Sequence, residues 1–515
     1  MIKYPFLLII LDGWGIAPAG GGNAISLAKT PVITNLTESY PSMLLEASGI
    51  SVGLPKGQDG NSEAGHMNLG AGRIVEQDVR IISQSINTGL FFKNPAFLTA
   101  INHVKKFNSN MHLIGLLSSW QSPHVELDHI VALLTLLKYR KVKNVFLHLF
   151  TDGRDSPKFE AIKLIKNLKE HFKNSEKVAT IIGRFYAMDR NKKWERTREA
   201  YELITEGKGI KAKNAEEAII SAYNRGQSDE FIQPTVIYKN SKPTALIKDN
   251  DAVIFFNLRS DRARQLTKTF TQEKFTEKNL GSFKRNKVLK NLLFVALTEF
   301  GPDLGNILTA YPSKDIPDTL PMVLRDKKQL YLAETEKYAH VTYFFNGGYA
   351  DPVASESRLM IPSPILMSYD KKPEMSAGEI TDKILEFLRK KQFDFYVINY
   401  ANPDMIGHTG NLTAGIKAVE FVDHCVGLVV KEVFKNNGQL IITADHGNIE
   451  EMINLKTGEI DTEHSTNPVP FILLNQDLKN KKVRKDGILG DVAPTILDIL
   501  EIDKPKAMTR RSLLI

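Results

Sequence analysis

Residues 59–73 form the run DGNSEAGHMNLGAGR, in which one hydroxyl, Ser62, lies among glycines, acidic residues and a histidine. The run has few apolar side chains, so packing alone does not explain its composition. Glycines at positions 60, 65, 70 and 72 would permit positive φ angles and a close approach of the backbone to a ligand. Ser62 is therefore a candidate nucleophile, which needs a base or a metal ion to lower its pKa. A plain Gly/Ser/Asn turn is the alternative interpretation of this segment alone.

Three apolar segments far apart in the chain each lead to an aspartate. They are residues 6–11 before Asp12, residues 393–400 before Asp404, and residues 439–443 before Asp445 and His446. Continuous apolar runs of this length are typical of buried parallel strands. Ligands bind outside the carboxyl ends of the strands in an open α/β sheet, so we expect the three carboxylates to meet at one edge. A divalent metal ion would compensate for their mutual repulsion.

The spacing of these residues predicts two metal sites. The first would be formed by Asp404, His408 and His464, and the second by Asp12, Ser62, Asp445 and His446. Asp404 and His408 are one helical turn apart, so both can reach the same ion. Mixed oxygen and imidazole ligands suit Mn²⁺, Zn²⁺ or Co²⁺ better than Mg²⁺ or Ca²⁺. For any single residue, a helix-capping aspartate or a hydrogen-bonded histidine is an equally good interpretation. That alternative is much weaker for all of them together.

Composition limits the kinds of partner and the cellular compartment that we expect for this protein. The 67 Lys and Arg residues exceed the 59 Asp and Glu residues, which gives a net charge of +8. This balance fits a small acidic substrate, and equally a lysine-rich proteome; no long basic tract predicts a nucleic-acid partner. The one cysteine, Cys425, lies in an apolar helical pattern and is expected to be a small buried hydrophobe, which favours a reducing compartment. No apolar stretch approaches ~18 residues, so we expect no membrane span and no membrane partner. We also expect a cytoplasmic location and a monomer.

Strand-like and helical segments alternate along the chain, which predicts an α/β fold with parallel-rich sheets. The clearest helical patterns lie at 128–139, 160–172, 378–391 and 412–434, and strand-like runs lie at 145–150, 178–182, 252–256 and 292–297. The candidate metal ligands come from both ends of the chain, and none lies between residues 80 and 310. We therefore expect a discontinuous metal-binding domain, residues 1–77 and 312–515, interrupted by an inserted α/β domain, residues 78–311.

The chain resembles the cofactor-independent phosphoglycerate mutases of the alkaline phosphatase superfamily. The motifs that carry the resemblance occur in the family's order and cover nearly all 515 residues. They are LDGWG (11–15), GNSEAGHMNLGAGR (60–73), TDGRDSP (151–157), GRFYAMDR (183–190), AETEKYAHVTYFFNGG (333–348), NYANPDMIGHTG (399–410), TADHGN (443–448) and HSTNPVPF (464–471). The resemblance implies an alkaline-phosphatase-like metal domain, its parallel-rich sheet flanked by helices, interrupted by an inserted transferase-like substrate domain.

The resemblance also implies an activity and the roles of particular residues. Ser62 would be phosphorylated during interconversion of 3-phosphoglycerate and 2-phosphoglycerate, with two divalent metal ions, of which Mn²⁺ is expected and Zn²⁺ or Co²⁺ are alternatives. No 2,3-bisphosphoglycerate would be needed. Lys337 would face the phosphoryl group, and Asp155 would move protons. The other groups expected to contact phosphoglycerate are His124, Arg154, Arg184, Arg190, Arg259 and Arg262, because arginine forks suit carboxylate and phosphate oxygens.

Two segments depart from the family's pattern. A glycine-rich turn is replaced by residues 119–123, and Ser260 stands where the family's arginine motif has a proline. These changes concern the orientation of glycerate rather than the chemistry. One alternative function is another metalloenzyme of the superfamily, a phosphatase or a phosphopentomutase, which would not need the inserted GRFYAMDR segment. Another is a catalytically inactive phosphoglycerate-binding or structural protein, against which the intact Ser62 and the metal-ligand candidates argue.

Overall fold

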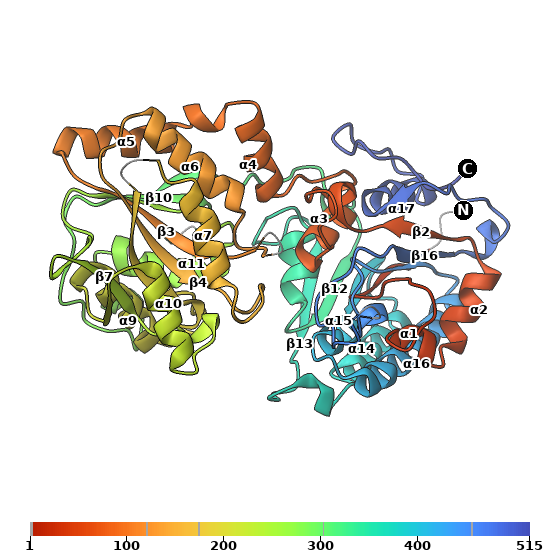
Figure 1. Ribbon diagram of the computed structural model, residues 1–515. Helices are drawn as coiled ribbons and strands as arrows, with labels where there is room; N and C mark the ends of the chain where they lie inside the picture. Colours follow the sequence, from red (N-terminus) through yellow and green to blue (C-terminus); the bar gives the residue numbers. More distant parts are fainter. Residues whose placement is uncertain (1–3, 120–121, 174–175, 302, 455–456) are drawn as a thin grey trace. The chain divides into compact units, whose positions relative to one another are not determined.

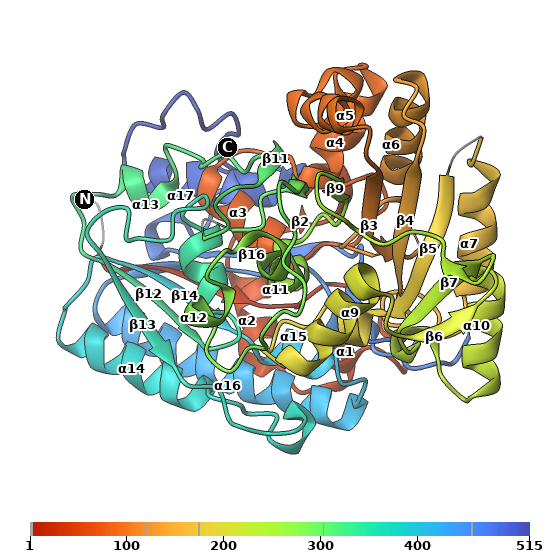
Figure 2. The ribbon, with the colours of Figure 1, turned by 90° about the vertical axis from the view of Figure 1, so that its left-hand side faces the viewer.

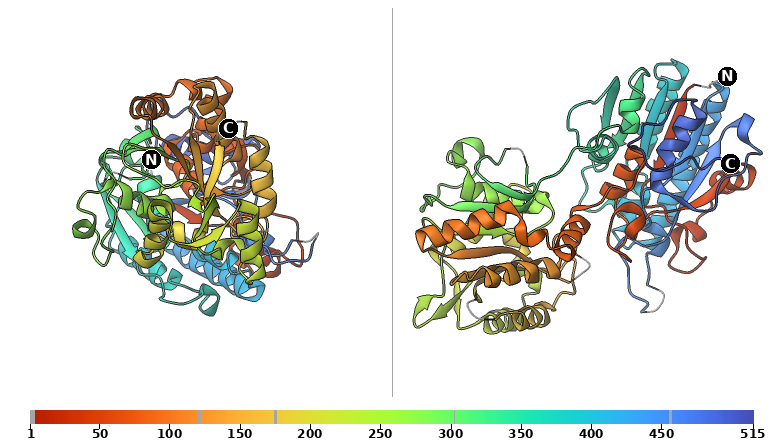
Figure 3. Two further views of the ribbon diagram at one scale, coloured as in Figure 1. Left: turned by 60° about the vertical axis from the view of Figure 1, so that its left-hand side comes forward. Right: turned by 90° about the horizontal axis from the view of Figure 1, so that it is seen from above.

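The structure is a computed structural model that describes residues 4–119, 122–173, 176–301, 303–454 and 457–515. Trp120 and Gln121, in the segment that departs from the family's pattern, lie outside the described residues. The chain divides into two compact units, Met1–Gln77 with Lys314–Ile515, and Asp78–Ser313. In Figures 1 and 3 the orange to green part of the chain forms the second unit, and both termini belong to the first. Within the described ranges no helix is long and apolar enough to cross a membrane.

The first unit is built on a sheet of eight described strands. Their order is β13 (Glu356–Ile361), β12 (Gln329–Glu334), β14 (Phe395–Tyr400), β1 (Phe6–Leu11), β15 (Gln439–Thr443), β16 (Val469–Leu474), β2 (Ser42–Glu46) and β17 (Gly487–Ile488). The strands from β13 to β15 are parallel, whereas β16 runs antiparallel to both of its neighbours. A largely parallel sheet needs cover on both faces, which explains the continuous apolar runs of β1, β14 and β15.

The three strands that lead to aspartates are neighbours in this sheet. β1 pairs in parallel with β14 on one side and with β15 on the other, with Leu11 opposite Tyr400 and Ile10 opposite Thr443. Their carboxyl ends therefore lie at one edge, and the residues that follow them are brought together there. The predicted strands and their shared direction are confirmed.

The helices of the first unit cover this sheet. They are α1 (Ala24–Leu27), α2 (Pro31–Ser39), α3 (Ser62–Ala71), α13 (Leu320–Val323), α14 (Ala377–Arg389), α15 (Asn402–Gly407), α16 (Leu412–Lys435) and α17 (Val492–Ile499). α14 and α16 pack side by side along the sheet (Figures 1 and 2). Both match the helical patterns predicted from the sequence. Cys425 lies buried in α16, as expected for a small hydrophobe.

The glycine-rich run around Ser62 is mostly helical, which corrects the expectation of positive φ angles. Helix α3 begins at Ser62, its N-cap Asn61 accepts a hydrogen bond from the Ala64 amide at 2.9 Å, and Gly72 ends it with φ +62°. The glycines inside the helix serve close packing instead: a Cβ at Gly65 would lie 2.4 Å from the Asp445 carbonyl oxygen, and one at Gly70 1.9 Å from that of Phe345. Only the glycine that ends the helix needs the left-handed conformation.

The second unit has its own sheet, with nine described strands. The order is β11 (Leu308–Tyr311), β10 (Leu293–Thr298), β9 (Ala252–Phe255), β3 (Met111–Leu117), β4 (Val145–Thr151), β5 (Glu176–Gly183), β7 (Thr235–Lys239) and β6 (Ile210–Ala212), and β8 (Lys242–Pro243) pairs with β7. From β11 to β5 all pairs are parallel. The chain passes from β3 through β4 to β5 on one side and from β9 to β11 on the other. The strand order therefore reverses between β3 and β9, the place where ligands bind in such sheets.

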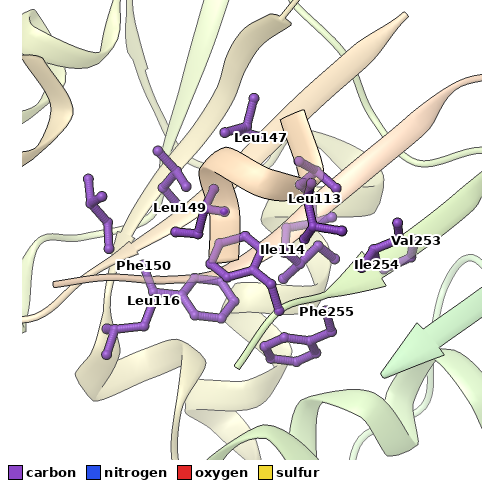
Figure 4. Packing of buried hydrophobic residues seen from close by; sticks show 14 of the residues in the cluster. Leu113, Ile114, Leu116, Leu147, Leu149, Phe150, Val253, Ile254 and Phe255 are labelled. Carbon is purple, nitrogen blue, oxygen red and sulfur yellow. The ribbon is translucent and has the colours of Figure 1, made fainter. Parts of the chain in front are cut away.

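Helices on both faces complete the second unit. They are α4 (Asp78–Asn87), α5 (Pro95–Phe107), α6 (Leu127–Tyr139), α7 (Ala161–Glu170), α8 (Arg184–Ala187), α9 (Trp194–Glu206), α10 (Ala215–Asn224), α11 (Ser260–Thr271) and α12 (Phe275–Lys278). Figure 2 shows β3, β4 and β5 side by side, with α7 and α10 along one face. Figure 4 shows the buried side chains that β3, β4 and β9 contribute to the core, among them Ile114, Phe150 and Phe255. The close packing of this core keeps the carboxyl ends of β3, β4 and β9 in fixed positions.

Candidate functional site

The hydroxyl of Ser62 lies at the N-terminus of α3, beside the carboxyl ends of β1 and β15. Its oxygen donates to Asp12 Oδ1 at 3.2 Å, lies 2.9 Å from His446 Nε2, and accepts from Lys337 Nζ at 2.8 Å. Ser62 is only 6% exposed. The amides at a helix N-terminus favour negative charge, so this position suits both a developing alkoxide and a phosphoryl group.

Asp12, Asp445 and His446 form one compact group beside Ser62. All three are fully buried, and one ligand atom from each lies within 4.8 Å of the others. Burial disfavours an imidazolium, but the surrounding carboxylates, Asp445 first, outweigh it and raise the pKa of His446 to about 10. The carboxylates thus favour a positive charge at this place, which is the proton on His446 in the absence of metal and would be a metal ion once that proton is displaced.

Two further buried side chains orient this group. Asn399, near the end of β14, donates to Asp12 Oδ2 at 2.6 Å, and its amide nitrogen lies 3.1 Å from His66 Nε2. His66, one turn after Ser62 on α3, has Nδ1 2.9 Å from the Ser62 carbonyl oxygen and 3.1 Å from Asp445 Oδ2. These contacts fix the rotamers of Asp12 and Asp445, a common arrangement around metal-binding carboxylates.

Asp404, His408 and His464 form a second group. Nε2 of His408 and Nε2 of His464 are 3.1 Å apart, and each lies 3.3 Å from Asp404 Oδ1. Nδ1 of His408 lies 2.8 Å from the Thr462 carbonyl oxygen, and Nδ1 of His464 lies 2.8 Å from that of Gly60. Each Nδ1–H therefore donates to a carbonyl, which leaves the two Nε2 lone pairs directed at the same point.

This geometry fits a metal ion. Two imidazole lone pairs and a carboxylate that converge within 3.3 Å repel one another unless a cation lies among them. Burial, together with nearby His446, lowers the pKa of His464 to about 4, so the ring is neutral and able to coordinate at neutral pH. Both groups combine carboxylate oxygen with imidazole nitrogen, the donor set that suits Mn²⁺, Zn²⁺ or Co²⁺.

Lys337 lies between the two groups. It follows β12, is 4% exposed, and its Nζ lies 2.5 Å from both Asp12 Oδ1 and Asp404 Oδ2. Burial opposes a charged ammonium, but the carboxylates of Asp12, Asp404 and Asp445 outweigh that effect and raise the pKa of Lys337. The side chain is therefore charged at every physiological pH and contacts the Ser62 oxygen directly, where it can neutralise a phosphoryl group.

The second unit gathers a separate polar cluster at the carboxyl ends of four adjacent parallel strands. β9 precedes Arg259, β3 precedes His124, β4 precedes Arg154 and Asp155, and Arg184 begins α8 after β5. The Leu258 amide donates to the His124 carbonyl oxygen at 2.8 Å, which ties the segment after β9 to the segment after β3. The cluster thus lies where the strand order reverses.

Asp155 is held ionised within this cluster. Arg184 Nη1 donates to Asp155 Oδ2 at 2.7 Å and to Asp152 Oδ1 at 2.5 Å, and Ser122 Oγ donates to Asp155 Oδ2 at 2.9 Å. Burial would raise its pKa, but Arg184 and the other positive and hydrogen-bonding neighbours lower the pKa of Asp155. His124 lies opposite: burial, Arg184 and Arg259 lower its pKa to about 3, so the ring is neutral, and its Nδ1 is buried without a hydrogen-bond partner among the described residues.

Of the remaining arginines, Arg190 and Arg259 pair with the carboxylate of Asp261, whereas Arg262 makes a different contact. Asp261 accepts from Arg190 Nη1 at 2.9 Å and lies 3.9 Å from Arg259 Nε. Arg262 instead donates to the Met188 carbonyl oxygen at 3.4 Å. Burial and the nearby Arg184, Arg190 and Arg154 lower the pKa of Arg262 to about 10. A guanidinium held among like charges is well placed to bind an anion.

Every candidate from the sequence thus lies in one of two places. Ser62, Lys337 and the two groups of ligand candidates share one edge of the first sheet, and the cluster around Asp155 occupies one edge of the second. Arg154 is more peripheral, with a side chain 56% exposed and 3.9 Å from Glu230. The sequence did not single out His66, Asn399, Asn448 or Glu450, although His66, Asn399 and Asn448 stand inside motifs already quoted.

Comparisons with known proteins identify the class. Residues 4–504 match the model of the metalloenzyme superfamily, in agreement with the parallel-rich sheet and the two groups of metal-ligand candidates. A crystal structure of Leishmania mexicana phosphoglycerate mutase, determined at low cobalt concentration, superposes with a TM-score of 0.82 at 27% identity, over 100% of this chain and 98% of that one. The expected fold class is confirmed.

More similar relatives define the family. A 2,3-bisphosphoglycerate-independent phosphoglycerate mutase of Clostridioides difficile is 47% identical over 518 residues, and one of Clostridium novyi is 46% identical over 517 residues. Both alignments cover 100% of this chain and 100% of the relative. The chain belongs to the family of 2,3-bisphosphoglycerate-independent phosphoglycerate mutases.

Proposed function

We propose that the protein interconverts 3-phosphoglycerate and 2-phosphoglycerate through a phosphoserine at Ser62, without 2,3-bisphosphoglycerate. The observation that carries the proposal is the convergence on one buried hydroxyl of Asp12, His446 and Lys337, at distances of 3.2, 2.9 and 2.8 Å. The family to which the chain belongs supports the reaction class.

The first half of the reaction would take place at the edge of the first sheet. Asp12, Ser62, Asp445 and His446 would hold one divalent ion, and Asp404, His408 and His464 would hold the other. When bound, the ions lower the pKa of the serine hydroxyl and neutralise charge on the phosphoryl group. Ser62 Oγ attacks phosphorus and the bond from phosphorus to the glycerate oxygen breaks. The proton that Ser62 loses is balanced by the one that the released glycerate oxygen takes up, and Lys337 balances the charge on the transferred group.

The second half requires that glycerate stays bound after it has lost its phosphoryl group. Arg184, Arg190, Arg259 and Arg262 would hold its carboxylate and hydroxyls, with His124 and Arg154 as further contacts. Asp155 is ionised at neutral pH and can accept the proton of the glycerate 2-hydroxyl as that oxygen attacks phosphoserine. The bond from phosphorus to Ser62 Oγ then breaks, and Ser62 takes up a proton to become a hydroxyl again. Residues 1–77 and 314–515 would thus serve phosphoryl transfer, and residues 78–313 would serve substrate binding.

The proposal also names a metal cofactor, a substrate class, a cellular location and an oligomeric state. Mn²⁺ is the proposed metal, with Zn²⁺ or Co²⁺ as alternatives, and the substrate is a small phosphorylated acid. A cytoplasmic location, a monomeric state and the absence of nucleic-acid or membrane partners remain predictions.

A coupled mutase assay on metal-stripped protein tests the proposal. Activity should be absent after chelation, return when Mn²⁺ is added, and need no 2,3-bisphosphoglycerate. Parallel additions of Zn²⁺, Co²⁺ and Mg²⁺ rank the metals. Full activity in chelator, or a strict requirement for the bisphosphate, would refute the proposal. A protein that releases phosphate from phosphoglycerate but forms no isomer would instead be a phosphatase.

A further inference from the structure

A buried carboxylate outside the ligand groups connects the turns that carry them. Glu450 lies in the short 3₁₀ helix Ile449–Glu451 and is 2% exposed. Its Oε2 accepts from the amides of Gly15 at 3.0 Å and Asn448 at 2.8 Å. Its Oε1 accepts from the side chains of Asn467, at 3.0 Å, and Ser465. Gly15 and Glu450 are 435 positions apart in the chain, so this carboxylate joins its two ends.

Each of the four donors lies within three residues of a proposed metal ligand, with Asn467 three residues after His464. Gly15 is in the turn that follows Asp12, Asn448 is two residues after His446, and Ser465 directly follows His464. Asn448 also donates from its side chain to Asp404 Oδ1 at 2.8 Å. Glu450 thus fixes, directly or through Asn448, the turns or side chains that supply ligands to both groups.

Packing around Glu450 leaves little room for the turns to shift. A Cβ at Gly15 would lie 2.3 Å from Glu450 Oε1, and one at Gly447 would lie 2.4 Å from the same oxygen and 2.3 Å from Ser465 Oγ. Gly447 and Ser465 also pair as an antiparallel bridge. The two glycines therefore permit the carboxylate to reach the backbone of both turns.

The chemistry of these contacts requires a carboxylate. All four partners act as donors, and an ionised carboxylate has acceptor sites for all of them on its two oxygens. A glutamine of the same length would direct an NH₂ group at two of these donors, so at least one pair of contacts must break or rearrange.

We propose that Glu450 is a positioning residue for both metal sites, which holds the turns after β1 and β15 and the segment around His464 at the spacing that coordination needs. The inference rests on the proposed function, because it takes the two groups as metal ligands. Outer contacts of this kind typically change metal affinity or activity by roughly 10- to 100-fold when they are removed.

The test measures Mn²⁺ affinity by calorimetry on chelator-stripped protein, alongside the melting temperature without metal. Glu450→Gln should weaken Mn²⁺ binding by roughly 10- to 100-fold. Ser465→Ala, which removes one donor, should weaken it in the same direction by a smaller factor. The matched control is Asp423→Asn: Asp423 is 2% exposed and accepts from the amides of Val32 at 3.1 Å and Ile33 at 2.7 Å, neither of which adjoins a proposed metal ligand in the sequence. That variant should lose melting temperature but keep its Mn²⁺ affinity.

Two results would overturn the inference, and they can be told apart. If Glu450→Gln and Ser465→Ala bind Mn²⁺ as tightly as the wild type while Asp404→Asn does not, then Glu450 serves stability alone and only this inference is wrong. If Asp404→Asn also keeps full affinity, then the metal site of the proposed function is wrong, and the inference is wrong with it.

Discussion

Replacing Arg262 by alanine should separate substrate binding from stability. Arg262 contacts the Met188 carbonyl oxygen at 3.4 Å, whereas the carboxylate of Asp261 accepts from Arg190. Burial and three neighbouring arginines lower the pKa of Arg262, so its charge is unfavourable until an anion arrives. The alanine variant without substrate should therefore melt at the same temperature as the wild type or above it, as is common when a functional charge is removed.

The loss of activity follows from the contact that Arg262 would make with glycerate. A charge-assisted, bidentate hydrogen bond contributes about 2–4 kcal/mol, equivalent to a factor of ~30 to ~1000. Mutase activity should fall by that factor, while hydrolysis of a small phosphate ester at Ser62 should change little. Part of the phosphoserine formed from 3-phosphoglycerate should be lost to water, so that phosphate and glycerate appear.

The matched control is Arg264→Ala, on the same helix α11. Arg264 pairs with Asp303, with its Nε 3.0 Å from Oδ1, and the pair is substantially exposed. Exposed pairs contribute roughly 0–1 kcal/mol, so this variant should keep both activities. An equal loss of mutase and phosphatase rates in Arg262→Ala, together with a lower melting temperature, would refute the division of labour and make Arg262 a structural residue.

Three further predictions concern metal, charge and pH. Asp404→Asn should lose Mn²⁺-dependent activity, because it removes the carboxylate shared by His408, His464 and Lys337; activity equal to the wild type at low Mn²⁺ would contradict this. Lys337→Met should lower the free energy of unfolding of the metal-free protein by about 3–5 kcal/mol, because the buried carboxylates lose their partner. Thermal melts should then show a larger stabilisation by Mn²⁺ in this variant than in the wild type; an equal stabilisation would contradict the prediction. Burial lowers the pKa of His129, on α6, from its ordinary 6.5 to about 4. The folded protein therefore favours the neutral ring. The stability of the fold is unaffected by this group above pH 6.5 and decreases as the pH falls towards 4, because the unfolded chain then binds the proton more readily. At pH 5 this loss is on the order of 2 kcal/mol, and His129→Gln should flatten the dependence of stability on pH between 7 and 5; an unchanged slope would exclude His129 as its source.

The strands and the ligand candidates follow from sequence because their signals are local. β1, β14 and β15 are covered on both faces, so each is a continuous apolar run, and the aspartate after each run marks the carboxyl end of the strand. Asp404 and His408 show the helical spacing that lets both side chains reach one point.

Other features have no local signal. The contact between Gly15 and Glu450 joins positions 435 residues apart, and nothing near either residue indicates it. The sequence predicts positive φ angles at Gly65 and Gly70, but both lie in a helix that packs against the backbone of Asp445 and Phe345. Sequence distinguishes poorly between a glycine that bends the chain and a glycine that allows close packing, because both need only the absence of a side chain. The choice of Arg190 rather than Arg262 as the donor to Asp261 likewise depends on tertiary packing.

The most direct test of the central claim is the chemical state of Ser62 during turnover. Mn²⁺-loaded protein, mixed with 3-phosphoglycerate and quenched in acid within one turnover, should yield a peptide covering residues 59–73 with one phosphate on Ser62. Ser62→Ala should give no phosphopeptide and no mutase activity, yet keep its fold. Full mutase activity in the alanine variant, or phosphate on another residue of an active enzyme, would contradict the account.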